Sequence, residues 1–232
     1  MTRSYEHRQF EDIRNRALSR VISDIECHDC HFKSCHLWAT DDPALRSTVR
    51  GVELHDCSQL ACYVDRVIFE DVLVDGLKNV GGMLQIYGAV FNRVVLRGKI
   101  HRLMISSFVE LTEDNPEMQK AFDEANAKYY RKVKWALDIS KGEFSELDLR
   151  GVPGRLVRRD PETQILVTRK KALEGSWRGL PWKDGLWEFV LDLFLQENTP
   201  DIVLVAGKRS QKFKALQADL KLLRKAGVAE PD

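Results

Sequence analysis

The chain lacks an excess of charge of either sign, since its 232 residues carry 36 Lys and Arg against 35 Asp and Glu, a formal charge of +1. Proteins dedicated to binding nucleic acid, or to imitating its acidic surface, usually depart from such balance. The chain also lacks a run of the roughly 18 apolar residues that a membrane span needs. Its first residues are too charged for a secretory signal. We therefore expect a cytoplasmic protein without membrane contact.

Catalytic and nucleotide-binding motifs are missing as well. No nucleophile stands in a recognisable pattern with a base. Residues 206–210 resemble the end of a phosphate-binding loop, but the upstream glycine is absent, with Val203 and its neighbours in its place. The pair Gly81-Gly82 has no strand-loop-helix context. The sequence therefore predicts no catalytic residue and no cofactor, and an enzyme, which stays an alternative, would have its site in residues 155–232.

What the chain does have is a repeat of five residues in its first two thirds. Every fifth position from residue 52 to residue 77 is apolar and mostly small: Val52, Cys57, Cys62, Val67, Val72 and Leu77. Four of the six residues found two places later are also apolar, and most residues between are polar. Neither a helix nor a strand has this period. Shorter runs of the same kind occupy residues 25–39, 84–106 and 137–154.

These runs resemble the pentapeptide repeat family, whose motif places a small residue, often Ala or Cys, two positions before a central Leu or Phe. The best matches are residues 30–34, 35–37 and 146–151. The resemblance implies a mainly β fold, a right-handed quadrilateral parallel β-helix whose two apolar positions point inward. We expect this solenoid over residues 25–154. The best-known members of the family protect DNA topoisomerases by presenting an acidic, duplex-like rod.

Helices are expected to interrupt or close this solenoid. Residues 1–24 should form a capping helix, because Phe10, Ile13, Ala17 and Val21 recur at helical spacing. A second helix is expected as an insertion at 113–136, with an apolar stripe of Met118, Phe122, Ala125, Tyr129 and Val133. Such an insertion suits partner specificity, or simply packs on the flank of the solenoid.

Residues 155–232 change in character and predict a small α/β or α+β domain. A hairpin is expected around the turn at 160–163, a buried helix over 186–195 and a short buried strand over 202–205. The final helix, 210–226, carries a seam of Phe213, Leu216, Leu220 and Leu223. This helix either packs on its own domain or pairs with a second copy to make a homodimer. Three tryptophans, Trp177, Trp182 and Trp187, either form core or stack on a partner.

Cysteines and histidines cluster near the N-terminus in spacings similar to a zinc site: Cys27, His28, Cys30, His31, Cys35 and His36. The repeat places these cysteines at inward positions and the histidines at outward ones. We therefore expect structural thiols rather than a metal centre. The odd total of five cysteines also fits reduced thiols better than disulfides. The outward histidines leave open a weak surface metal site or a pH-sensitive patch.

Local charge is uneven although the total is balanced. Residues 51–80 carry a net charge of −4 and residues 81–108 a net charge of +4. The candidate interaction residues come from these two runs: Asp65, Glu70, Asp71, Asp75, Arg93, Arg97, Lys99 and Arg102. If the runs are successive layers of the solenoid, an acidic section lies on a basic one.

These features favour a non-enzymatic scaffold for protein–protein interactions, because opposed charged patches fix the orientation of a protein partner. One alternative is a DNA mimic that binds a topoisomerase such as gyrase through the acidic run. Another is nucleic-acid binding through the basic residues, which the balanced charge makes less favoured.

Overall fold

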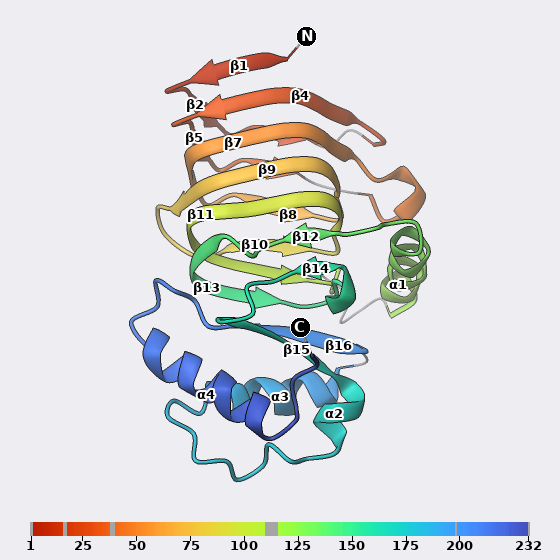
Figure 1. Ribbon diagram of the computed structural model, residues 1–232. Coiled ribbons are helices and arrows are strands. Elements are labelled where there is room, and N and C mark those ends of the chain that lie inside the picture. Colours follow the sequence, from red (N-terminus) through yellow and green to blue (C-terminus); the bar gives the residue numbers. More distant parts are fainter. Residues whose placement is uncertain (1, 16–17, 38–39, 110–115, 198, 232) are drawn as a thin grey trace.

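The computed structural model describes all residues except 1, 16–17, 38–39, 110–115, 198 and 232. The protein is mainly β, with 42% of its residues in strands, and its parallel sheet curls as a half-barrel (Figure 1). This confirms the mainly β prediction. Among the described residues, no helix is long and apolar enough to cross a membrane.

The large sheet has 14 strands, and all of its pairings are parallel. They are β1 (Arg3–Glu6), β2 (Gln9–Glu11), β3 (Arg14–Asn15), β4 (Val21–His28), β5 (His31–Lys33), β6 (His36–Leu37), β7 (Thr48–Leu60), β8 (Tyr63–Asp65), β9 (Ile68–Asn79), β10 (Leu84–Tyr87), β11 (Val90–Ser106), β12 (Leu137–Asp138), β13 (Gly142–Leu149) and β14 (Val157–Arg158). The 3₁₀ helices η1 (Pro43–Leu45) and η3 (Gly154–Leu156) lie between strands.

The five-residue repeat sets the register of this sheet. Ile25 on β4 lies beside Val52 on β7, which lies beside Val72 on β9, and Val72 lies beside Val94 on β11. Equivalent repeat positions therefore become neighbours on adjacent parallel strands. Apolar side chains that recur in the sequence stack on one another in space, which is why the pattern produces one continuous core.

The backbone repeats with the same period. Residues at positions 51, 56, 61, 66, 71 and 76 all have φ between 51° and 81°, each directly before an apolar repeat position. Gly51 and Gly76 adopt this left-handed conformation without strain, and aspartates such as Asp56 tolerate it better than most residues. The chain therefore turns a corner every five residues.

The predicted inward positions are largely buried. Val52, Cys57, Val67, Val72 and Leu77 have at most 8% of their surface exposed and belong to one core cluster, whereas Cys62 is half-buried. The burial confirms which side of the sheet each repeat position faces.

The prediction of an N-terminal capping helix over residues 1–24 is wrong. Residues 3–15 form β1, β2 and β3, and β4 begins at Val21. Tyr5 and Phe10 are five residues apart, and Phe10 stacks on Phe32 of β5 with ring centroids 5.2 Å apart. The repeat therefore extends upstream of residue 25, and the helical spacing in this short segment was coincidental. Ala17, on which the helix prediction also relied, lies outside the described residues.

The inserted helix is confirmed over a shorter range, as α1 (Pro116–Tyr130). Residues 113–115 lie outside the described residues, and residues 131–136 are not helical. The helix packs on the sheet, because Tyr129 donates a 3.0 Å hydrogen bond to Glu70 and the Tyr130 hydroxyl accepts one of 3.3 Å from the Phe91 backbone. Phe122 is fully buried.

The C-terminal residues form the expected mixed α and β unit. β15 (Gln164–Thr168) pairs antiparallel with β16 (Asp201–Val205), and three helices pack on this pair: α2 (Arg169–Leu173), α3 (Leu186–Gln196) and α4 (Phe213–Lys225). The hairpin prediction is wrong, since β14 joins the large sheet through β12 and only β15 pairs with β16. The turn at 160–163 suggested that the strand before it would pair with β15. The partner of β15 is instead β16, which follows α3 in the sequence.

This C-terminal unit covers one end of the large sheet (Figure 1). Leu166, Val203 and Val205 contribute to the core of the large sheet. The Arg209 backbone N–H donates a 2.9 Å hydrogen bond to the Phe144 carbonyl of β13. Apolar and polar contacts thus join the two parts.

Candidate functional site

The acidic and basic runs lie on adjacent strands and pair with each other. The Arg93 guanidinium donates to both carboxylate oxygens of Asp71, at 2.5 and 2.7 Å, and Arg97 donates to Asp75 at 2.8 Å. The hydrogen bond from Arg93 holds the pKa of Asp71 below its usual value. The predicted stacking of an acidic section on a basic one is therefore present, but its charges neutralise each other.

Other predicted interaction residues are also paired. Glu70 accepts hydrogen bonds from Arg50 at 2.6 Å and from Tyr129, while Arg102 pairs with Glu146 at 2.8 Å. Lys99 is exposed and lies opposite Glu143 in the register of β11 and β13. These residues line several strands and do not form a patch of one sign.

Asp65 is not a surface residue, which corrects its selection as an interaction residue. It is 1% exposed and pairs with Arg66 at 2.6 Å, and Arg66 also reaches Asp41 at 2.8 Å. Its position in the repeat predicted an outward side chain, but the pair is covered where Arg66 contacts Met118 and Phe122 of α1. The ion pair is part of the fold.

The C-terminal seam is not available to a second copy. Leu216, Leu220 and Leu223 are at most 5% exposed and belong to the core of the C-terminal unit, and Phe213 packs partly buried against the same core. The seam residues therefore pack on their own domain, which was the other alternative for this helix. A dimer, if formed, needs a different surface.

The remaining C-terminal motifs are structural. Trp177 and Trp187 are buried, and their indole N–H groups donate to the carbonyls of Ala172 and Leu216. A Cβ at Gly207 would lie 2.7 Å from the Phe144 carbonyl, so this glycine permits close packing of the loop on β13. Lys208 pairs with Asp160. The loop at 206–210 thus joins parts of the fold rather than forming a phosphate cradle.

Three of the five thiols are buried at inward positions, as the repeat predicted, whereas Cys35 and Cys62 are half-buried. Cys27, Cys30 and Cys57 are at most 2% exposed, and the Cys57 thiol donates to the carbonyls of Cys27 and His55. Burial raises the pKa of Cys27 to about 12 and that of Cys57 to about 11. Protonated, buried thiols are poor metal ligands and poor nucleophiles.

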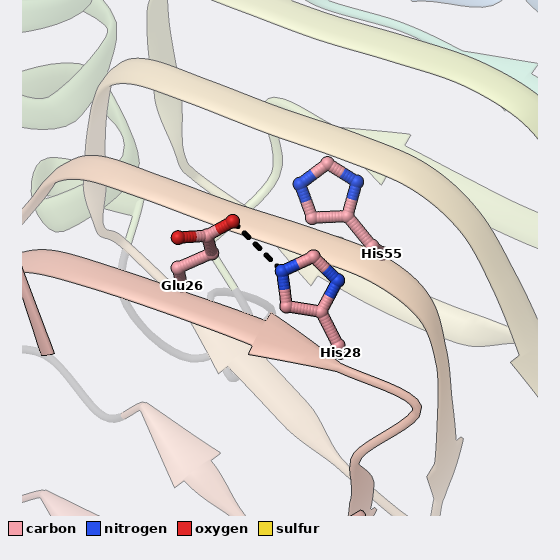
Figure 2. Close-up of side chains that lie close together, drawn as sticks. All are labelled: Glu26, His28 and His55. Atoms are coloured by element: carbon pink, nitrogen blue, oxygen red, sulfur yellow. Dashed lines mark hydrogen bonds and ion pairs between the residues drawn. The ribbon is translucent and has the colours of Figure 1, made fainter. Parts of the chain in front are cut away.

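The outward histidines of the sequence cluster lie on three different strands. His31 of β5 contacts Ser58, and His36 of β6 lies beside Tyr63. His28, at the end of β4, instead lies beside His55 of β7, with ring centroids 4.6 Å apart and planes 6° apart (Figure 2). The three histidines do not form one site, but His28 lies beside His55, which the sequence cluster did not include.

His28 and His55 form a group of potential metal ligands together with Glu26. The Glu26 carboxylate lies 2.7 Å from His28 Nε2, and the ligand atoms of Glu26, His28 and His55 all lie within 4.8 Å of one another (Figure 2). Sequence reasoning missed this group because Glu26 and His55 lie on different strands, far apart in the sequence. The signal was present in the cysteines: Cys30 and Cys35 have the same spacing as Cys57 and Cys62, which aligns His28 with His55.

The other prominent surface is the open edge of the large sheet, formed by β1, β2 and β3. Within the described residues, each of these strands pairs on one side only, with β4, β5 and β6 respectively. Ile13, Leu18 and Val21 are 49%, 56% and 55% exposed beside these strands. Unpaired strand edges together with exposed apolar side chains are typical of sites where another chain docks.

No family model, no curated protein and no solved structure matches this chain.

Proposed function

We propose that the protein is a non-enzymatic interaction scaffold of the pentapeptide repeat type, which docks a protein partner on the open edge formed by β1, β2 and β3. The proposal extends the parallel sheet to a right-handed, four-sided β-helix. It is supported by the left-handed corner residues every five positions and by the parallel register between equivalent repeats. A cytoplasmic location suits the five free thiols.

The open edge is the observation that carries the interaction function. β1, β2 and β3 leave backbone N–H and C=O groups on one side without strand partners among the described residues. Exposed Ile13, Leu18 and Val21 add apolar area to the same end. Backbone pairing along an edge gives affinity, while the apolar side chains beside it give specificity.

A second copy of this chain is the partner that fits this edge best. Phe10 already stacks on Phe32, and Tyr5 lies edge-on to Phe10 at 5.4 Å. Tyr5 and Phe10 therefore give the end of the sheet an aromatic surface, while Arg3 takes the position that Ile25 has in the next layer. The equivalent end of a second copy offers a layer of matching shape. The two copies would then be related by a two-fold axis, and their contact would close into a dimer.

The charge pairs argue against the alternatives. A DNA mimic for a topoisomerase needs unpaired acids, yet Asp71 and Asp75 are bound by Arg93 and Arg97. Nucleic-acid binding needs available cations, and Arg93 and Arg97, two of the four basic residues of the predicted run, are neutralised by these pairs. A protein partner that docks on the edge strands requires neither.

Hydrogen–deuterium exchange at low and high protein concentration tests the proposal. Amides of residues 3–15 should become protected as concentration rises, because their free N–H groups gain strand partners. Amides of β16 serve as the internal control, since they are paired within the chain. Edge strands that exchange at the same rate at every concentration would overturn the second copy as partner.

A further inference from the structure

Two short motifs with the same pattern, a Glu and a His separated by one residue, stack on the outer face of the sheet. Glu26-Cys27-His28 ends β4, and Glu53-Leu54-His55 lies within β7. The parallel register places Glu26 beside Glu53 and His28 beside His55. Glu26, His28, Glu53 and His55 therefore occupy a small square of positions on two adjacent strands, with Cys27 and Leu54 pointing to the other side of the sheet.

Three side chains of this square, those of Glu26, His28 and His55, are already close to one another (Figure 2). His28 Nε2 lies 2.7 Å from a Glu26 oxygen, and His55 Nε2 lies 3.1 Å from a Glu53 oxygen. Both rings come from adjacent strands and lie face to face. In each motif, the nitrogen that could bind a metal already faces a carboxylate.

We propose that Glu26, His28 and His55 bind a divalent transition metal of the zinc type, with Glu53 as the fourth ligand. Imidazole nitrogen and carboxylate oxygen are ligands that zinc takes in tetrahedral sites, at about 2.0–2.2 Å. The nitrogen donors favour zinc, cobalt, nickel or copper over calcium and magnesium, which prefer oxygen alone.

The charge and the mobility of the ligands suit this role. Two carboxylates and two neutral imidazoles balance the charge of one divalent ion. His28 is 40% exposed and Glu26 38%, so the rings and carboxylates have room to turn toward a common point. The neighbouring Asp75, which lies beside His55 in the register, is held by Arg97 at 2.8 Å and is not needed as a ligand.

The position of the square gives the metal a structural consequence. It joins β4 to β7, two strands that are separated in the sequence by the segment containing η1. A bound ion would therefore cross-link the layers nearest the open edge to the rest of the sheet. Because the ion binds only the folded arrangement, it would raise the melting temperature as its concentration rises.

Calorimetric titration of the full chain with Zn²⁺, and visible spectroscopy with Co²⁺, test the site. We expect one ion per chain, and the variants His28→Ala and His55→Ala should each weaken binding by about tenfold or more. His31→Ala is the matched control, since His31 faces outward on β5 beside Ser58 and should bind the metal like the unaltered protein. Glu26→Gln, which preserves shape, should weaken binding without altering the fold.

Metal binding by the cysteines is the main competing explanation for any zinc binding. The absorption spectrum with Co²⁺ distinguishes thiolate ligands from nitrogen and oxygen ligands. Thiolate ligands would add an intense charge-transfer absorption that nitrogen and oxygen ligands do not produce. Absence of Zn²⁺ binding would overturn the proposal. Binding that survives both His28→Ala and His55→Ala, or that shows cobalt–thiolate absorption, would overturn it as well.

Discussion

The two ends of the parallel sheet are closed in different ways. At the C-terminal end, β15 and β16 lie over the last strands, and Leu166, Val203 and Val205 enter the same core as the repeat residues. At the N-terminal end, β1, β2 and β3 have no strand beyond them within the described residues, and Ile13 and Leu18 are about half exposed.

This difference shows what a repeat sheet requires. Each interior layer buries its apolar positions against the layers on both sides, so the end layers alone lack a neighbour. The chain provides a neighbour at one end by adding a second small core. No described residue forms a comparable cover at the other end, and for this reason we assign the proposed docking function to that end rather than to the charged strands between.

The largest expected effect comes from removing a matched aromatic side chain at each end. Phe144 on β13 is 1% exposed in the core under the C-terminal unit, whereas Phe10 on β2 is half-buried at the open edge. Phe144→Ala should lower the free energy of unfolding by about 3–5 kcal/mol. Phe10→Ala should cost about half of this or less. Urea unfolding monitored by circular dichroism measures both, and equal losses would contradict the comparison.

A smaller effect is expected where the C-terminal unit meets the sheet. A Cβ added at Gly207 would lie 2.7 Å from the Phe144 carbonyl and 2.9 Å from the Ser145 carbonyl, both backbone atoms. Gly207→Ala should therefore cost about 1–3 kcal/mol in stability, because the cover must move away from β13. Gly82→Ala is the control, since nothing lies within 4 Å of the added Cβ. A Gly207→Ala protein as stable as this control would show that the cover is loosely attached.

The smallest effect on stability concerns the charged strands between the two ends. The pKa of Asp71 is lowered by its hydrogen bond to Arg93. The stability that the ionised carboxylate adds to the fold is therefore fully present above the unfolded pKa of 3.8, and it is lost as pH falls through the lower pKa of the folded state. Because the pair is nearly half exposed, Asp71→Asn should cost less than about 1 kcal/mol at neutral pH.

Thermal unfolding of both proteins from pH 7 to pH 2 measures this contribution. The difference between Asp71→Asn and the unaltered protein should disappear at the acid end of the range. A difference that grows in acid would mean that the carboxylate is not stabilised by Arg93.

The sequence predicted the parts of the fold that depend on local pattern. The spacing of Val52, Cys57 and Val67 indicated which residues are buried, because each repeat position faces the same side at every layer. The helix at 116–130 followed from its apolar stripe. These inferences needed no knowledge of which segments are neighbours in space.

The inferences that failed depended on contacts between distant segments. The residues around Phe10 fit both a helical spacing and the five-residue repeat. The contact that distinguishes the strand from the helix, stacking of Phe10 on Phe32, lies on another segment of the chain. The seam of Leu216 and Leu220 could face its own domain or a second copy, and the partner surface on α3 and β16 decided this. Glu26 and His55 become neighbours through the register, which includes a longer connection between β4 and β7 than between β7 and β9.

The most direct test of the docking edge is the molar mass in solution, measured by sedimentation equilibrium over a range of concentrations. We predict a dimer for the unaltered chain and a monomer for Leu18→Glu, which places a charge at the open edge. Val80→Glu is the matched control, because Val80 is also 56% exposed but lies after β9, away from this edge, and the variant should remain dimeric. An unaltered chain that stays monomeric, or a dimer that Leu18→Glu leaves intact, would contradict the assignment of the open edge as the docking surface.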